Sequence, residues 1–358
     1  MSTARHLLSC GAIALAMVVA GCATDPAQPP DTPAIQRVIA ATPAKGSVFR
    51  AVAIDREVED RILALDPERI SEADVATTLL KAPAPQIMLL HGGIYPVHVM
   101  MESTGTFLVK MGYPEARIRQ PGDRRWSHNP YEDSAKLAGL LAWYYEQEGV
   151  RPMMIGHSQG GIQAVKVLYE LAGKFESSVP VWDPYTDKSL ERTTIIDPLT
   201  GAERPVVGLV LVSYTSTIGA GGMTLLLPNQ WSMLDKMYTI PDTVEEYTGY
   251  QLDLDPIGWK GTWEANGKAT VRNVQLPFGY NHLTTPYVAP LADDAAARAW
   301  IDAYEPGGKN PDPPQQSIGY AVFWAADLWH GVKKHWALEA QRLIRAKRAA
   351  TASSLTAG

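Results

Sequence analysis

Cysteine is scarce in this sequence. The 358 residues include two cysteines, Cys10 and Cys22, and both lie near the N-terminus. The remaining chain therefore has no cysteine for a disulfide, and it has no Cys/His cluster with the spacing of a zinc site. Internal repeats are absent as well, which excludes a solenoid or another repeat architecture.

A large excess of charge of one sign is also missing. The chain has 32 basic and 38 acidic residues, which gives a net charge of −6. This balance does not favour a nucleic-acid partner. Hydrophobic residues make up 46% of the chain, enough for a large core. The length is compatible with a single α/β domain.

An apolar stretch at the N-terminus, residues 12–20, follows Arg5 and precedes Cys22. It is too short for a confident membrane span and predicts a signal peptide over residues 1–21. The letters VAGC, which end at Cys22, resemble a bacterial lipobox. This resemblance implies cleavage before Cys22 and acylation of that residue, and several acyl chains would anchor the protein stably. A signal peptide cut elsewhere is the alternative.

Residues 22–45 are rich in proline and predict a semi-rigid tether that holds the folded domain, residues 46–358, off a membrane. The residue after Cys22 is Ala23 and not aspartate, which resembles outer-membrane sorting in some bacteria. We therefore expect a protein of the bacterial cell envelope that is anchored to the outer membrane. The prolines of the tether are Pro26, Pro29, Pro30, Pro33 and Pro43.

From residue 86 onward, short apolar segments alternate with segments of helical spacing. This alternation predicts a mostly parallel central sheet with helices on both faces. Strands are expected at 86–93, 115–123, 151–156, 204–216 and 269–277, and residues 247–258 predict a strand that runs into a loop at Asp255 and Pro256. Helices are expected at 96–114, 130–150, 160–174 and, as a tryptophan-rich C-terminal extension, about 316–350. Residues 181–205 predict a surface hairpin.

Residues 156–160, GHSQG, match the pattern G-x-S-x-G with Ser158 at the centre. The pattern falls between a predicted strand and a predicted helix, which is the context of a nucleophile elbow. In such an elbow the serine occupies a sharp, strained turn, and glycines leave room for neighbouring backbone. The backbone N–H of Gln159 would then point at a developing oxyanion, while His157 is expected to point elsewhere.

Together with LLHGG at 89–93, the segment GHSQGG at 156–161 resembles the α/β-hydrolases of the bacterial lipase and esterase kind. The resemblance covers residues 86 to about 175 well, and the remainder in outline. It implies the α/β-hydrolase fold, a serine nucleophile and no cofactor or metal. It also implies a second oxyanion donor after the first strand, for which the N–H of Gly93 is preferred and that of Ile94 is the alternative.

A serine nucleophile needs a histidine base, and the histidine needs a carboxylate. In this fold they follow in the order serine, acid, histidine. His282 lies in a loop after a predicted strand, where the fold places its base. His330 and His335 lie on the predicted C-terminal helix, where packing or surface roles are more common. His282 is therefore the predicted base.

The acid is less sharply predicted. Asp255 is the first choice because it follows a strand-like segment one strand before the histidine. Asp253 is the second choice, since strand alternation would place it on the same face. The carboxylates in suitable loops are Asp183, Asp187, Asp197, Asp235, Asp242, Asp253 and Asp255.

The sequence thus predicts a lipid-anchored serine hydrolase that cleaves a small-molecule or lipid ester through an acyl-enzyme. Residues 218–250, rich in Leu, Met and Trp, predict either a cap over an apolar acyl pocket or a core helix. The same residues would also serve an amidase, a peptidase or a thioesterase, because fold does not decide the substrate. A non-catalytic envelope lipoprotein and a cofactor-free peroxidase or lyase are further alternatives.

Overall fold

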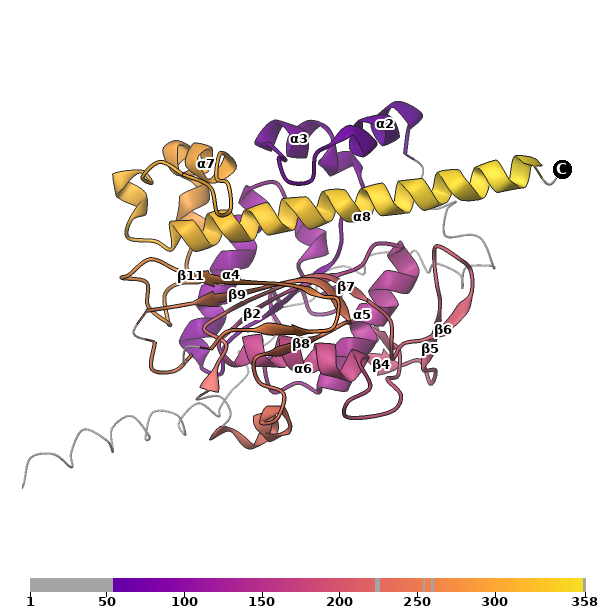
Figure 1. The fold of residues 1–358 in the computed structure, drawn as a ribbon, viewed down its shortest axis with the longest axis horizontal. Helices are drawn as coiled ribbons and strands as arrows, with labels where there is room; N and C mark the ends of the chain where they lie inside the picture. Colours follow the sequence, from indigo (N-terminus) through magenta and orange to yellow (C-terminus); the bar gives the residue numbers. More distant parts are fainter. Residues whose placement is uncertain (1–53, 223–225, 254, 259–260, 357–358) are drawn as a thin grey trace, which may run out of the picture.

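The computed structural model describes residues 54–222, 226–253, 255–258 and 261–356 (Figure 1). The predicted signal peptide, the tether and Cys22 lie outside these residues. None of the helices in the described ranges combines the length and the apolar character that a membrane span requires.

A five-stranded parallel sheet forms the centre of the molecule, which confirms the predicted α/β class. Because every neighbouring pair is parallel, the carboxyl ends of all five strands meet at one edge. In spatial order the strands are β1 (Ile87–Leu90), β2 (Met153–His157), β7 (Val212–Ile218), β9 (Val244–Gln251) and β11 (Thr270–Gln275).

Helices cover both faces of this sheet, and its strands β2 and β7 are buried throughout. Figure 1 shows α8 on one side and α5 and α6 on the other. Alternation along β1 sends Ile87 and Leu89 into the core with α4 and α8, and Met88 and Leu90 into the core with α5 and α6. The helices are α4 (Tyr95–Lys110), α5 (Ser134–Glu148), α6 (Gln159–Leu171) and α8 (Val322–Thr356).

The long helix α8 packs on the sheet through Trp324, Trp329 and Trp336, which are all buried. The shorter helices α2 (Arg56–Ala64) and α7 (Ala295–Asp302) contact α8, and α3 (Glu72–Thr77) lies beside α2 (Figure 1). Helix α8 therefore lies on this face of the sheet, and helices from both ends of the described chain pack against it.

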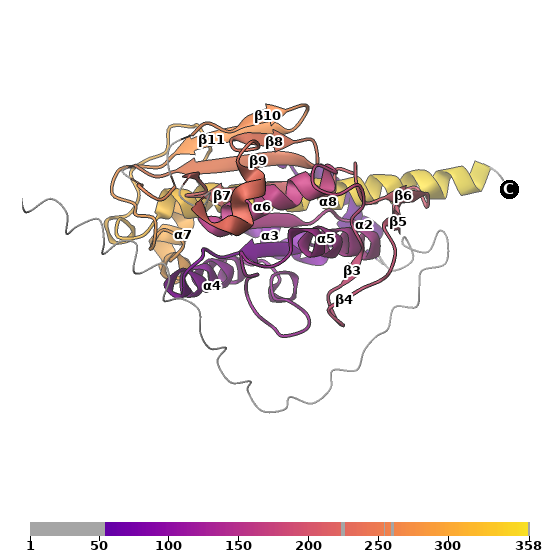
Figure 2. The same ribbon diagram turned by 90° about the horizontal axis from the view of Figure 1, so that it is seen from below.

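Short elements occupy the periphery (Figure 2). The predicted surface hairpin at 181–205 is two antiparallel hairpins in succession, β3 (Trp182–Asp183) with β4 (Lys188–Ser189) and β5 (Thr194–Ile196) with β6 (Glu203–Pro205). Strands β8 (Thr239–Pro241) and β10 (Glu264–Asn266) form a small parallel pair. The 3₁₀ helices are η2 (Leu79–Lys81), η3 (Glu115–Arg117), η5 (Pro228–Met233), η6 (Ala289–Ala292) and η7 (Gln315–Ser317).

Two of the predicted strands differ from the structure. Residues 115–123 begin with η3 and form no strand, because arginines and a Pro-Gly turn leave too few apolar positions to join a buried sheet. The chain returns to β1 only at His128, which forms an isolated parallel bridge with Leu90. The strand expected at 204–216 starts at Val212, since the chain turns at Gly208, where φ is +90°.

The boundaries of two other predicted segments also move. The cap expected at 218–250 overlaps the central sheet, because β9 begins at Val244, where β-branched and aromatic residues favour a strand. Between β7 and β9 the described chain forms η5 and β8, so a core helix does not form there either. The C-terminal helix expected at about 316–350 begins at Val322 and runs to Thr356.

Candidate active site

Three predicted side chains meet at the carboxyl edge of the sheet. Ser158 directly follows β2, Asp255 lies in the loop after β9, and His282 lies in the loop after β11. The Nε2 atom of His282 lies 2.7 Å from the Oγ of Ser158, and its Nδ1 atom lies 2.7 Å from the Oδ2 of Asp255. The structure thus joins the three residues in one chain of hydrogen bonds. Their catalytic roles stay predictions.

The backbone of Ser158 is strained in the way that an elbow requires. Its φ is +56° and its ψ is −123°, a conformation that costs a residue with a side chain free energy. The surrounding structure holds it, since the Ser158 N–H donates to the Ile218 carbonyl at 2.9 Å and the Ser158 carbonyl accepts from the Gly161 N–H at 2.9 Å. This turn between β2 and α6 directs Oγ away from the sheet and toward His282.

Close backbone contact explains Gly160, the second glycine of the motif. A Cβ at this position would overlap the carbonyl oxygens of Leu90 and His91 at the end of β1. Glycine therefore lets the start of α6 approach β1 directly. The loop that follows β1 is brought against the nucleophile elbow as a result.

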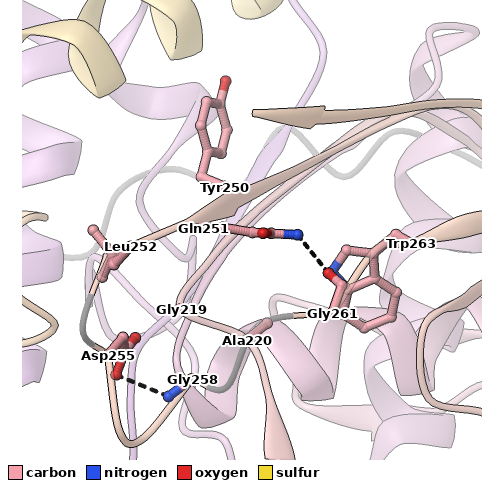
Figure 3. A pocket seen from close by; sticks show the side chains of 9 residues that line it. All are labelled: Gly219, Ala220, Tyr250, Gln251, Leu252, Asp255, Gly258, Gly261 and Trp263. Carbon is pink, nitrogen blue, oxygen red and sulfur yellow. Dashed lines mark hydrogen bonds between the residues drawn. The ribbon is translucent and has the colours of Figure 1, made fainter. Parts of the chain in front are cut away.

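Asp255 is held by backbone donors as well as by the histidine. Its Oδ1 accepts hydrogen bonds from the N–H groups of Ile257 and Gly258, both at 2.9 Å; Figure 3 shows the bond from Gly258. Burial acts to raise the pKa of Asp255, but the hydrogen bond and positive charge of His282 and the two N–H groups outweigh it, so the pKa is lowered. The carboxylate is therefore ionised near neutral pH.

The ionised Asp255 also decides the tautomer of His282. A carboxylate can only accept, so Nδ1 of the imidazole carries the proton and donates it. The Nε2 atom then has a free lone pair directed at the Ser158 hydroxyl. In this state the imidazole can take the proton of the serine.

A small cavity lies behind the carboxylate. Its volume is about 10 Å³, room for roughly one water molecule, and its lining includes Asp255, Gly219, Gln251 and Trp263 (Figure 3). The carboxylate therefore borders a space that is no larger than one water molecule.

The loop after β1, which holds the predicted second oxyanion donor, lies against the nucleophile elbow. A Cβ at Gly92 would lie 3.2 Å from the Ser158 Cβ, and one at Gly93 would overlap the side-chain oxygen of Gln159. Within the described ranges, no acceptor takes a hydrogen bond from the backbone N–H of Gln159 or of Gly93. The same holds for the N–H groups of Gly92, Ile94 and Gly160, so the assignment of Gln159 and Gly93 as oxyanion donors stays a prediction. Ile94 follows in an extended conformation as the N-cap of α4.

Two residues of the site escaped the sequence analysis. A Cβ at Gly219, just after β7, would lie 2.8 Å from the Nδ1 of His282 and 3.3 Å from the Oδ2 of Asp255. His157 was expected to point elsewhere than the nucleophile, and its Nε2 atom lies 2.7 Å from the backbone carbonyl oxygen of His282. The glycine cluster after β7 was a visible signal for the first. No local pattern indicated the second.

The other candidates lie elsewhere. Strand β9 ends at Gln251, so both aspartates lie in the following loop, and the Oδ1 of Asp253 accepts a hydrogen bond from Gln275 at 3.4 Å. His335 is buried in α8 beside Glu246, and His330 of the same helix lies near the carbonyl of Glu68. As expected, neither histidine reaches the serine.

The described residues form no group of three or more His, Cys, Asp and Glu side chains able to hold a metal ion. A groove of about 470 Å³ lies along α5, at 120–136 and 184–187, and the three residues of the site do not line it. Its charged side chains pair with each other, His128 with Glu132 and Lys136 with Asp187. The groove therefore gives no indication of a particular ligand.

Comparison with known proteins gives little beyond this geometry. No protein-family model matches the chain, and no curated protein matches it. One similar solved structure is that of a protein of unknown function from Agrobacterium tumefaciens, provisionally classed as an alpha/beta hydrolase. The alignment covers 65% of this chain and 90% of that chain at 14% identity, with a TM-score of 0.31. A likeness at this level carries no argument about activity.

Proposed function

We propose that the protein is a serine hydrolase with an α/β-hydrolase fold that cleaves carboxylic esters. The observation that carries this proposal is the connected set of Ser158, His282 and Asp255 around a strained serine turn. The residues follow in the order serine, acid, histidine, each after a strand of one parallel sheet, which supports the assignment of the fold.

The geometry supports the following reaction. The Oγ of Ser158 attacks the ester carbonyl carbon while its proton passes to Nε2 of His282, and Asp255 stabilises the resulting imidazolium. The N–H groups of Gln159 and Gly93 hold the oxyanion; one such donor typically contributes about 3 kcal/mol. The intermediate collapses as the imidazolium gives its proton to the leaving alcohol. Water then attacks the acyl-enzyme with His282 as base, and the acid is released with Ser158 reprotonated.

Exposed apolar side chains follow the ends of β1, β7 and β11, three strands of the sheet whose carboxyl edge carries Ser158. Apolar surface near that edge would suit an acyl chain better than a charged or strongly polar substrate. The residues are Ile94, Tyr95, Leu226, Trp231, Leu234, Phe278, Leu283 and Tyr287.

A panel of 4-nitrophenyl esters with increasing acyl length, run beside a panel of peptide 4-nitroanilides, tests this proposal. We expect ester turnover that rises with acyl length before it levels off, with little anilide turnover. Ser158→Ala is expected to reduce kcat by about six orders of magnitude. A folded Ser158→Ala protein with undiminished turnover would exclude the mechanism, and preferential anilide cleavage would replace the ester with an amide.

A further inference from the structure

His157 is the last residue of β2 and is completely buried. Its ring lies 4.9 Å from the ring of His282, and its Nε2 atom lies 2.7 Å from the backbone carbonyl oxygen of the same residue. The contact joins residues that are 125 positions apart in the chain. It therefore links the strand that carries the nucleophile directly to the loop that carries the base.

The chemistry of this contact leaves one protonation state. A carbonyl oxygen can only accept, so the Nε2 of His157 carries a proton and donates it. Burial, followed by the charge of His282, lowers the pKa of His157 to about 3, against the opposing effects of the hydrogen bond and of Asp255. The ring is thus neutral near pH 7, with an unprotonated Nδ1. Besides His282 and Asp255, the titratable group that faces it is His91.

The other side of the same ring contacts the loop after β1. A Cβ at Gly92 would lie 3.2 Å from the Nδ1 of His157, so the ring packs closely against the backbone there. Within the described part of the chain, this Nδ1 atom has no hydrogen-bond partner. The hydrogen bond that the ring of His157 makes is therefore the one from Nε2–H to the carbonyl oxygen of His282, in the loop that carries the base.

We propose that His157 is a positioning residue, whose Nε2–H fixes the backbone of His282 so that the imidazole keeps its contacts with Ser158 and Asp255. This role rests on the proposed function. It adds to that function a residue that touches neither substrate nor reacting atoms and acts through the base.

The base loop needs such a support because it is irregular and partly exposed. Phe278 is 76% exposed and Leu283 is 43% exposed. Other anchors act at neighbouring residues: Asn281 accepts from the N–H groups of Leu283 and Thr284, Thr104 of α4 donates to the Pro286 carbonyl at 2.8 Å, and the Tyr280 hydroxyl accepts from the Phe323 N–H at 3.3 Å. Among the described residues, the bond from His157 is the hydrogen bond that the backbone of His282 makes.

A neutral ring also suits this position. During the reaction His282 becomes positively charged, and a second charge beside it would oppose that step. Because His157 stays neutral, it supplies a hydrogen bond without an opposing charge. A lysine or arginine at the same place would supply the hydrogen bond together with an opposing positive charge.

The test compares His157→Leu with His157→Gln. Leucine fills much of the space but has no donor, whereas the side-chain amide of glutamine can place an N–H near the position of Nε2. We expect His157→Leu to lower kcat about 10- to 100-fold with KM changed less than about threefold, because a slightly misplaced base slows chemistry more than binding. The midpoint of the acid limb of kcat/KM moves to lower pH. His157→Gln recovers most of kcat and the original midpoint.

His335→Leu serves as the matched control. It also removes a buried histidine, but one whose partner is Glu246 and not the base loop. It is expected to lower the Tm while the acid limb keeps its midpoint. A merely structural effect of His157→Leu would resemble this control, with no change of midpoint and no recovery by glutamine, and would overturn the positioning role.

Failure of the inference and failure of the proposed function are distinguishable in the same experiment. A wild-type protein that neither cleaves esters nor reacts with a fluorophosphonate probe would reject the proposed function and this role with it. A reactive wild type whose kinetics and labelling rate are unchanged by His157→Leu would reject the positioning role alone.

Discussion

A methyl group at residue 219 would collide with the imidazole of His282, since its carbon would lie 2.8 Å from Nδ1. The backbone there also has a φ of +59°, a left-handed conformation that a side chain makes costly. The space that this glycine leaves free is filled by the histidine and the acid. The site therefore depends on small residues as much as on reactive ones.

We predict that Gly219→Ala lowers kcat by about two orders of magnitude, because the base must move away from the serine. The Tm falls as well, since a left-handed alanine costs roughly 1 kcal/mol. Gly201→Ala is the control: its φ is +69°, and a Cβ there would have no atom within 4 Å. Kinetics and thermal unfolding of both variants check this. Equal loss of activity in both would show that the collision has no role.

A second prediction separates the acid from its neighbour. Asp255→Asn is expected to lower kcat about 10⁴-fold, because the imidazole loses the partner that fixes its tautomer and stabilises its charge. His282→Ala costs about as much as Ser158→Ala, since members of such a set act as a unit. Asp253→Asn is expected to stay within a few fold. Damage from Asp253→Asn, with Asp255→Asn harmless, would contradict the contact at Nδ1.

Residues that follow a strand in a recognisable pattern could be predicted, and residues defined by a long-range contact could not. Ser158 was marked by its glycines, and His282 and Asp255 by their places after strand-like segments. The contact of His157 with His282 could not be predicted, because the two residues are 125 positions apart and no local pattern shows it. Only the folded sheet, with β2 brought beside the base loop, creates that contact.

At the scale of elements, the network between β9 and α8 has a role in stability. Glu246 of β9 accepts hydrogen bonds from His335 at 3.3 Å and Lys334 at 2.8 Å. Burial acts to raise the pKa of Glu246, but the hydrogen bonds and charges of these two partners outweigh it and lower the pKa to about 2. A carboxylate with a pKa below its unfolded value stabilises the fold above pH 4.5, and that stabilisation is lost as the pH falls toward 2.

Glu246→Gln is therefore expected to lower the free energy of unfolding at pH 7 by about 2 kcal/mol, because a neutral amide loses the charge-assisted hydrogen bonds from His335 and Lys334. Between pH 4.5 and 2 its stability should fall less steeply than that of the wild type. Glu68→Gln is the control, since Glu68 contacts the same Lys334 at 2.8 Å but its side chain is 60% exposed, and it should cost less than about 1 kcal/mol. Urea unfolding of the wild type and both variants across this pH range measures these free energies. If the free energy of unfolding depended on pH in the same way in the wild type and in Glu246→Gln, the pKa shift would be contradicted.

Element types were predictable where a segment carries one clear signal. The buried strands β1 and β2 and the helices α4, α5 and α6 form where apolar runs and helical spacing indicated them. The segment at 115–123 failed because its alternation was short and its arginines had no place in a core. Strand β9 was placed too late, since its start at Val244 follows a Leu- and Met-rich stretch that obscured the change of period.

At the scale of the whole molecule, we propose that the described domain is attached to a membrane through acylated Cys22 and the proline-rich tether. Both are readings of the sequence outside the described residues. The apolar loops at the carboxyl edge of the sheet would then work near a lipid surface, where apolar esters are concentrated.

Cys22→Ser is expected to abolish incorporation of a palmitate analogue and to leave an uncleaved or soluble protein, because the thiol is the site of the first acyl chain. Metabolic labelling followed by fractionation of the envelope measures both. Cys10→Ser, within the predicted signal peptide, should label normally. Label retained in Cys22→Ser would show that the N-terminus is processed in another way.

The most direct test of the central claim is to map the residue that a fluorophosphonate probe modifies. We predict a single adduct on the peptide that contains Ser158, with no adduct in Ser158→Ala and a slower reaction in His282→Ala. The reason is that only a serine with an adjacent base and free oxyanion donors reacts readily with such a probe. An adduct on another residue, or no adduct in a folded protein that still cleaves esters, would contradict Ser158 as the nucleophile.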